Sequence, residues 1–177
     1  MMKQEQDIKK ETLLDIAKKM VVAARTAPKG RGIDHMTFMI AEKSDIERIA
    51  GKMKEIAEKE QLAGFARDAD NILQTEVMVL LGTKYAAVGL KKCGLCGYQD
   101  CEEKTRHPES ACVFNTGDLG IAIGSAVSIA ADCRVDNRIM YSVGLAVQEL
   151  GIFSSDIKLA FGIPLSATSK SPFFDRK

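Results

Sequence analysis

Apolar and charged side chains alternate with the period of an α-helix along the first part of the chain. The charged positions Lys9, Lys10 and Lys18 fall off the apolar face. That face is formed by Leu13, Ala17, Met20, Val21 and Ala24. The spacing predicts an amphipathic helix over residues 5–27. It should end before Pro28, because proline pushes the residue before it out of the helical region.

A loop, a strand and a second helix are predicted next. Glycine and proline punctuate residues 27–32, and the run His-Met-Thr-Phe-Met-Ile-Ala at 35–41 indicates a strand. Ser44 and Glu47 have the spacing of a capping box, in which each side chain bonds a free backbone amide of the other residue. They predict a helix that runs to about Gln61.

A short helix at 65–74 and a strand at 77–82 precede the longest stretch without a periodic pattern. The run Val-Met-Val-Leu-Leu-Gly is short enough for a strand that is buried on both faces. Residues 85–115 form a predicted loop, and so long a loop in a compact domain usually serves a function. A bound metal would supply the order that its sparse apolar content cannot.

Small and apolar residues dominate the next predicted helix. Asp118 is its expected N-cap, and the helix should end near Asp132. Gly120, Gly124 and Ser125 give it a small-residue face that suits close approach of another helix.

The last part of the chain predicts a helix and a strand. Asp136 is the expected cap of a helix that Gly151 terminates. Its apolar stripe is Ile139, Val143, Val147 and Leu150. Residues 157–163 form the final predicted strand, and Pro164 opens a polar tail.

This order of elements indicates an α+β fold. We expect a single domain over residues 1–177, with a cysteine-rich metal-binding insert at 85–115. A chain of this length buries a substantial core without needing a metal for its overall stability.

The composition excludes several classes of partner. Charged residues make up 28% and hydrophobic residues 46% of the chain, and the net charge is +1. Nucleic-acid binding is disfavoured because there is no basic stripe and no Trp. The longest uncharged stretch, residues 119–131, is too short to span a bilayer, so no membrane association is expected. The opening Met-Met-Lys-Gln-Glu-Gln lacks an apolar signal segment, and we expect a cytoplasmic protein.

Four cysteines within twenty residues carry the strongest chemical signal. Cys93, Cys96, Cys101 and Cys112 have the spacing C-x2-C-x4-C-x10-C, and a glycine follows each of the first two. Those glycines let the backbone turn so that the sulfurs face a common centre. Thiolates favour zinc or an iron-sulfur cluster over harder ions. The residues alone leave a cluster, structural zinc and no metal open, while disulfides are disfavoured in a reducing compartment.

Two further residues have simpler interpretations. Cys133 follows the uncharged stretch and is expected as a small buried hydrophobe. His107 lies inside the cysteine-rich segment and is expected as a solvated loop residue rather than a ligand.

Several segments resemble known families. Cys-Gly-Leu-Cys-Gly-Tyr-Gln-Asp-Cys at 93–101 resembles the C-G-x-C-G-x-x-x-C opening of small domains that ligate a 4Fe-4S cluster. Ala-Ala-Arg-Thr-Ala-Pro-Lys-Gly-Arg-Gly at 23–32 resembles the A-P-S-x-x-N loop region of FMN-dependent nitroreductases. The predicted helix from Asp136 to Gly151, with Phe-Gly-Ile-Pro at 161–164 after it, is similar to their D-x-G-x-A-x-x-N-x-x-L-x-A-x-x-L-G helix and the G-x-P strand that follows. Together they make the chain resemble the ferredoxin domain-containing family, which joins a nitroreductase-like scaffold to a four-cysteine cluster insert.

The resemblance implies a nitroreductase-like sheet flanked by helices, a homodimer, a 4Fe-4S cluster on the four cysteines and FMN at the subunit boundary. Nitroreductases begin with an R-R-S-x-R segment that holds the flavin phosphate, and this chain has none before Leu13. The candidate phosphate-binding residues are Arg25, Lys29, Gly30 and Arg31, where cations flank backbone amides. The alternative for them is a solvated basic loop.

Two classes of function follow. The first is a ferredoxin-like electron-transfer protein or an FMN-dependent oxidoreductase with an iron-sulfur cluster. The second is a non-catalytic binding module with a four-cysteine zinc site and no flavin. No catalytic acid or base stands out, and the residues do not indicate a redox partner.

Overall fold

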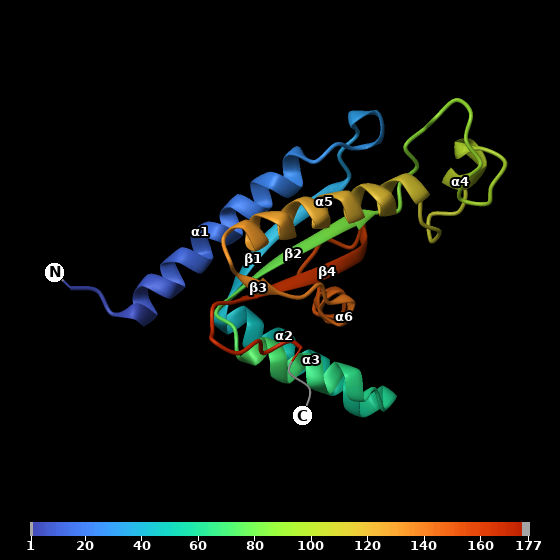
Figure 1. The fold of residues 1–177 in the computed structure, drawn as a ribbon. Coiled ribbons are helices and arrows are strands. Elements are labelled where there is room, and N and C mark those ends of the chain that lie inside the picture. Colours follow the sequence, from blue (N-terminus) through green and yellow to red (C-terminus); the bar gives the residue numbers. More distant parts are fainter. Residues whose placement is uncertain (1, 175–177) are drawn as a thin grey trace.

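The computed structural model describes residues 2–174 and shows a four-stranded antiparallel sheet with the strand order β1-β2-β4-β3 (Figure 1). The strands are β1 (Met36–Glu42), β2 (Val77–Lys84), β3 (Asp136–Asn137) and β4 (Ile157–Ser166). The helices are α1 (Glu5–Thr26), α2 (Lys43–Glu60), α3 (Ala63–Leu73), α4 (Cys101–Thr105), α5 (Val113–Asp132) and α6 (Tyr141–Glu149), with a 3-10 turn, η1, at Gly30–Gly32. The predicted α+β class is confirmed.

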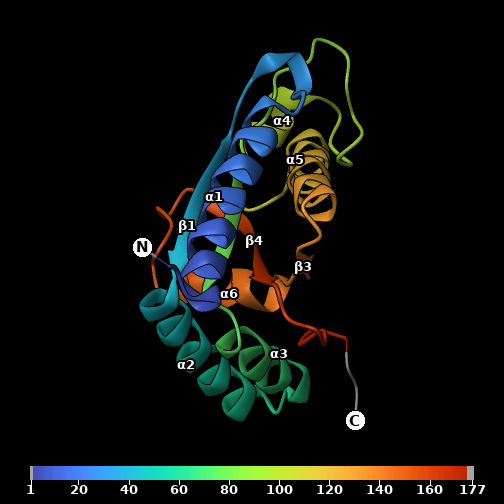
Figure 2. The same cartoon turned by 60° about the vertical axis from the view of Figure 1, so that its left-hand side comes forward.

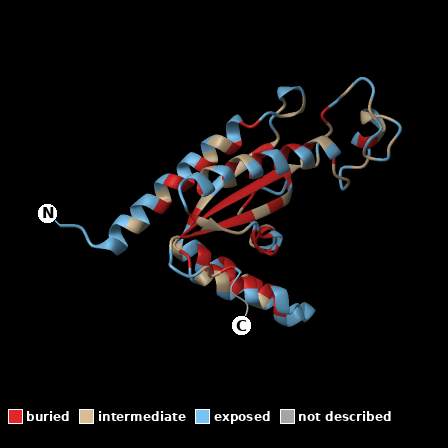
Figure 3. Cartoon of the chain, viewed as in Figure 1, coloured by how far each residue is buried: buried red, intermediate tan, exposed pale blue. Residues whose placement is uncertain are grey.

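Helices cover both faces of the sheet and give the molecule two hydrophobic cores. Helices α1 and α5 lie side by side on one face, while α2, α3 and α6 cover the other (Figure 2). Strand β2 supplies both cores: Val79 and Leu81 belong to the first, and Met78 and Leu80 to the second. Buried positions line the strands and the inner sides of the helices (Figure 3). The prediction of a strand buried on both faces is therefore confirmed.

Helix α6 packs unusually close to the central strand β4. A Cβ atom added at Gly144 would overlap the backbone carbonyl of Ala160. Only glycine allows this contact, which seats the helix directly on the sheet.

The first helix and strand match the prediction within a residue or two, but the start of α2 does not. Its capping box is formed by Glu42 and Asp45 rather than by Ser44 and Glu47. The backbone N–H of Glu42 donates to the Asp45 carboxylate at 3.5 Å. Because β1 leads directly into α2, the capping residue is the last residue of the strand.

Helix α5 begins at Val113, so the prediction that Asp118 caps it is wrong. Asp118 lies in its second turn, on the buried side of the helix. Ser125 lies on the side of α5 that packs against α1, and its hydroxyl donates to the carbonyl of Ala23 at 2.9 Å. Gly120 and Gly124 face outward. By length and composition alone this helix could span a bilayer, but its inner face packs on the sheet.

Asp136 does not cap a helix either, and the prediction of a helix from 136 to 151 is corrected to α6 alone. Asp136 lies in β3, where it pairs with Ser166. Of the predicted apolar stripe, Val143 and Val147 are buried, whereas Ile139 is exposed.

Strand β4 continues through Pro164, so the prediction that this proline opens a polar tail is wrong. Gly162 exchanges backbone hydrogen bonds with Met140, and the nitrogen of Pro164, two residues on, points to the same side. There β3 pairs only with Leu165 and Ser166, so the missing N–H removes no ladder bond. Residues 175–177 of the predicted tail lie outside the described residues.

Cys133 is exposed, which contradicts its prediction as a buried residue. It occupies the C-cap position of α5, and the chain turns away through Arg134 with a φ of 59°. The apolar stretch before it packs on the sheet, but the helix ends before Cys133 can join it.

Candidate metal centre and adjoining basic loop

Residues 85–112, here called the cysteine loop, project from one end of the sheet beyond the carboxyl end of β2 (Figures 1 and 2). All four predicted ligands lie on this loop as free thiols. Cys93, Cys96 and Cys101 are partly buried, and Cys112 is buried. The loop is therefore a separate structure held at both ends by the scaffold.

Local backbone chemistry sets the positions of the last two cysteines. Cys101 is the first residue of α4, whose N-cap Asp100 accepts a hydrogen bond from the N–H of Glu103 at 2.8 Å. Cys112 is the N-cap residue of α5. Cys112 therefore lies where the cysteine loop joins the scaffold. Gly97 adopts a φ of 90°, a turn that other residues rarely accept.

Side-chain contacts also fold the cysteine loop onto itself. The rings of Tyr98 and His107 stack with centroids 4.8 Å apart, and the Tyr98 hydroxyl lies 2.6 Å from that of Ser110. The N–H of Gln99 donates to the Glu103 carboxylate at 2.6 Å. His107 is therefore part of the packing within the loop.

The donor chemistry of the loop fits a soft metal, because four reduced thiols lie within one short segment. Within residues 2–174, no three His, Cys, Asp or Glu side chains are grouped closely enough to hold an ion. Metal binding by Cys93, Cys96, Cys101 and Cys112 therefore requires the loop to draw the sulfurs together. A cavity of about 620 Å³ lies beside Cys93, between the loop and Phe114 of α5.

A buried lysine stands at the base of the loop. Lys104 on α4 is only 2% exposed, and its Nζ donates to the backbone carbonyls of Tyr85 and, at 3.4 Å, of His107. These bonds join the start of the cysteine loop to its centre. Sequence patterns do not reveal this residue, because a lysine beside two glutamates is typical of a solvated helix.

Asn115 holds the two ends of the cysteine loop together. Its side-chain amide donates to the carbonyl of Lys84 at 3.1 Å and to that of Ala86 at 2.5 Å. Its side-chain oxygen lies 3.2 Å from Nδ1 of His35. Asn115 is 1% exposed, so these bonds form away from water. The base of the loop is thus joined to the segment that leads into β1.

The predicted flavin residues lie beside this base, on the segment between α1 and β1. Arg25 donates to the Asp34 carboxylate at 2.6 Å and lies over the Phe38 ring at 4.4 Å. Lys29 turns back and donates to three carbonyls at the end of α1, those of Ala24, Arg25 and Ala27. Such a lysine stabilises the exposed carbonyls of a helix end.

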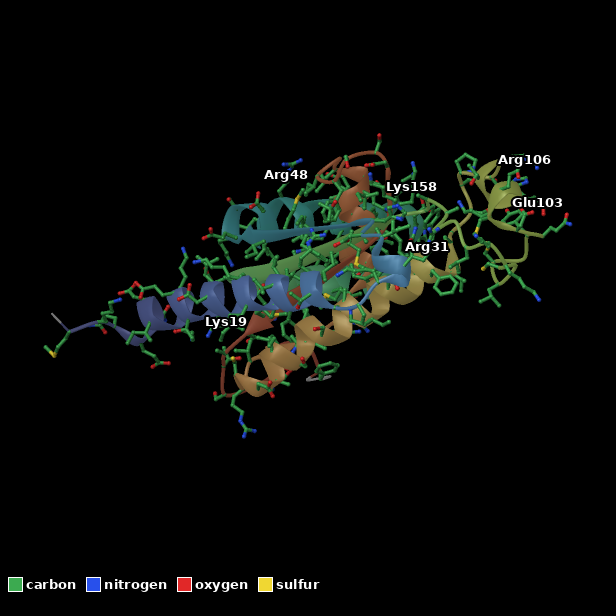
Figure 4. The ribbon with its side chains drawn as sticks, turned by 90° about the horizontal axis from the view of Figure 1, so that it is seen from above. Lys19, Arg31, Arg48, Glu103, Arg106 and Lys158 are labelled. Atoms are coloured by element: carbon green, nitrogen blue, oxygen red, sulfur yellow. The ribbon has the colours of Figure 1, made fainter. Side chains whose placement is uncertain are left out.

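Gly30 and Arg31 join this basic loop to the neighbouring elements. The N–H of Gly30 donates to Asp118 on α5 at 2.9 Å. Arg31 donates to the carbonyls of Val88 and Gly89 at 3.1 and 2.5 Å, so it contacts the cysteine loop directly. Figure 4 shows Arg31 at the end of the molecule that carries the loop residues Glu103 and Arg106. The structure thus brings the two predicted sites together.

Charge at this end of the molecule is largely paired. Burial acts to raise the pKa of Asp34, but hydrogen bonds from Arg25 and from the N–H of Met36, with the charges of Arg25 and Lys29, outweigh burial and hold that pKa below its ordinary value. A hydrogen bond from Lys84, and then one from Ser154, lower the pKa of Asp156 to about 2.

Comparison with solved structures defines the class of fold. The nitroreductase CinD of Lactococcus lactis, solved in complex with nicotinic acid, superposes with a TM-score of 0.64 at 12% identity, over 96% of this chain and 81% of that one. A nitroreductase of Desulfitobacterium hafniense with bound FMN superposes with a TM-score of 0.61 at 13% identity, over 99% of this chain and 85% of that one. The scaffold is therefore nitroreductase-like.

Sequence comparison places the chain in a family. Residues 109–176 match the family described as "Uncharacterized protein containing a ferredoxin domain (DUF2148)". An uncharacterized protein of Archaeoglobus fulgidus is 37% identical over 183 residues, which cover 99% of this chain and 98% of that protein. The chain belongs to this family of ferredoxin-domain proteins. Of the four loop cysteines, the matched segment contains Cys112.

Proposed function

We propose that this protein is a ferredoxin-like redox protein that binds a 4Fe-4S cluster through Cys93, Cys96, Cys101 and Cys112. The observation that carries the proposal is that all four are free thiols on one loop held to the scaffold at both ends. Membership of a ferredoxin-domain family supports the redox class. When bound, such a cluster supplies one-electron transfer.

The protein's own residues would position the ligands and limit contact with water. Asn115 and Lys104 bind backbone carbonyls at the base of the loop, and the Tyr98–His107 stack packs its centre. Fixed loop ends reduce the conformational entropy that metal binding must overcome.

We extend the proposal to FMN, which would make the protein a flavin-linked oxidoreductase. The nitroreductase-like fold supports this, as does the position of the basic loop beside the cysteine loop. The phosphate of FMN would compete with Asp34 for Arg25, and with the carbonyl of Gly89 for Arg31. Lys29 and Gly30 complete the proposed phosphate-binding loop.

The engagement of those same cations favours a second candidate function. Arg25, Lys29 and Arg31 all bind groups of their own chain. A non-catalytic module with a four-cysteine zinc site needs no free cations in this loop. The same four cysteines would then hold structural zinc.

We also propose a cytoplasmic homodimer. Ile121 is exposed on the outer side of α5, beside Gly120 and Gly124, which have no atoms within 4 Å of an added Cβ. This uncovered apolar face suits a second copy of the chain. Light scattering on the purified protein tests the dimer, and a monomer at micromolar concentration would contradict it.

Spectroscopy of anaerobically purified protein tests the proposed function. Broad absorption at about 400 nm, bleached by dithionite, is expected for thiolate-ligated iron. Flavin released on denaturation would be measured by its fluorescence. A colourless preparation with stoichiometric zinc would favour the second candidate instead.

A further inference from the structure

The ammonium group of Lys104 is buried without a compensating charge. Its side chain is among the largest fully buried ones of the protein. Among the described residues no carboxylate lies within ion-pair distance of its Nζ, which bonds only the neutral carbonyls of Tyr85 and His107. An isolated buried charge is costly and is normally paired with an opposite charge or with a metal centre.

The acidic groups around Lys104 are engaged elsewhere. Asp100 caps α4, and Glu103 accepts from the N–H of Gln99. Glu102 lies 3.9 Å from Arg106, and Asp156 is paired with Lys84 at 2.6 Å. None of these carboxylates forms an ion pair with Lys104, whose Nζ bonds only backbone carbonyls.

The surroundings of Lys104 add positive charge. A cavity of about 450 Å³ is lined by Lys84, Lys104 and Lys158 together with Asp156. Asp156 compensates only Lys84. Lys158 lies on β4, toward the end of the molecule that carries the cysteine loop (Figure 4). The lining of this cavity therefore carries three lysines and one carboxylate.

Cys101 lies three residues before Lys104 on α4, so the two side chains are neighbours on one helix face. A centre of four thiolates with Zn²⁺, or with an oxidised 4Fe-4S core, carries two net negative charges. We propose that Lys104 is the buried counter-charge of the four-cysteine centre and raises both its metal affinity and its reduction potential. This inference rests on the proposed function, although it holds for either metal.

The sign of the effect on potential follows from charge. Adding one electron makes the centre more negative, and a nearby cation stabilises the reduced state more than the oxidised state. Replacing the cation with a neutral group therefore lowers the midpoint potential.

A purely structural role makes different predictions. If Lys104 only joined the carbonyls of Tyr85 and His107, its loss would destabilise the metal-free and metal-loaded proteins alike. As a counter-charge, Lys104 lacks an opposite charge when no metal is bound, so Lys104→Met should destabilise the metal-free protein less than the metal-loaded protein.

The test compares Lys104→Met and Lys104→Arg with Lys92→Met, an exposed lysine directly before Cys93. Metal affinity is measured by titrating the metal-free full-length chain with Co²⁺, followed by displacement with Zn²⁺. Lys104→Met should weaken binding about 10- to 100-fold. Lys104→Arg should recover most of it, and Lys92→Met should change it by less than about threefold, because water screens its charge.

Thermal unfolding with and without metal, and the midpoint potential of the iron-loaded protein, complete the test. A larger fall in the melting temperature of Lys104→Met in the metal-loaded form than in the metal-free form, together with a lower potential, supports the inference. Equal losses in both forms, or unchanged affinity, overturn it while leaving the proposed function intact. Failure of the wild-type chain to bind Co²⁺, Zn²⁺ or iron at the cysteines overturns both.

Discussion

The backbone N–H of Gly30 donates a hydrogen bond to the carboxylate of Asp118 at 2.9 Å, across 88 positions of sequence. The bond joins the basic loop after α1 to the second turn of α5. Because Cys112 is the N-cap residue of α5, both predicted sites are attached to this helix. A Cβ at Gly30 would lie 3.3 Å from the Phe114 ring, so the turn is also closely packed.

Asp118→Ala should lower the free energy of unfolding by about 1–3 kcal/mol, because a buried bond between a backbone donor and a charged acceptor is lost. Urea unfolding at neutral pH measures the change. The control is Asp70→Ala, whose carboxylate forms an exposed ion pair with Lys54 and should matter little. Equal effects of the two substitutions would contradict the role given to Asp118.

Gly144→Ala should destabilise the fold by about 3 kcal/mol or more, since the new methyl group would overlap the carbonyl of Ala160. Gly51→Ala on α2, where an added Cβ has open space, should instead stabilise it by about 0.5–1 kcal/mol. Chemical unfolding of both variants decides the matter. Opposite signs are the expected result, and a tolerated Gly144→Ala would show that α6 does not pack directly on β4.

Asn115→Ala should release the base of the cysteine loop. Its amide bonds to Lys84 and Ala86 are lost, and faster proteolysis within residues 85–112 is expected. Limited digestion with mass spectrometry locates the cuts. The control Thr116→Ala removes only an exposed hydroxyl bond one residue later. An unchanged cleavage rate in Asn115→Ala would argue that other contacts hold the loop.

The Lys84–Asp156 pair predicts a pH dependence. The bond from Lys84 lowers the pKa of Asp156 to about 2, below its unfolded value. Its stabilising effect is therefore present above about pH 4 and is lost as the pH falls toward 2. Melting temperatures of the wild type and Asp156→Asn should differ at pH 5 and converge near pH 2. A constant difference across this range would contradict the assigned pair.

Sequence patterns predict those elements that depend only on residues close by in the sequence. The periodic apolar face of α1 and the uniformly apolar β2 are confirmed because burial alone determines them. The prediction of Asp118 and Asp136 as helix caps is wrong because Asp118 accepts from Gly30, far away in sequence, and because Asp136 lies in a strand that pairs with the distant Ser166. No local pattern distinguishes an aspartate that caps its own helix from one that binds another loop, as Asp118 does, or lies in a strand, as Asp136 does.

Some residues of the candidate site can likewise be predicted from the sequence, and others cannot. The cysteines are visible in the sequence because their spacing is short and regular. Lys104 and Asn115 carry no such signal, since a buried lysine and a solvated one have the same letter in the same polar context. Their roles depend on where β2 ends and α5 begins, and those ends are set by tertiary packing.

Metal analysis of anaerobically prepared wild type and Cys96→Ser tests whether these cysteines hold an iron-sulfur cluster. We expect iron and acid-labile sulfide in equal amounts, about four of each per chain in the wild type, and their loss in Cys96→Ser without loss of the fold by circular dichroism. Stoichiometric zinc without iron, or iron retained in Cys96→Ser, would contradict the assignment of a 4Fe-4S cluster to these four cysteines.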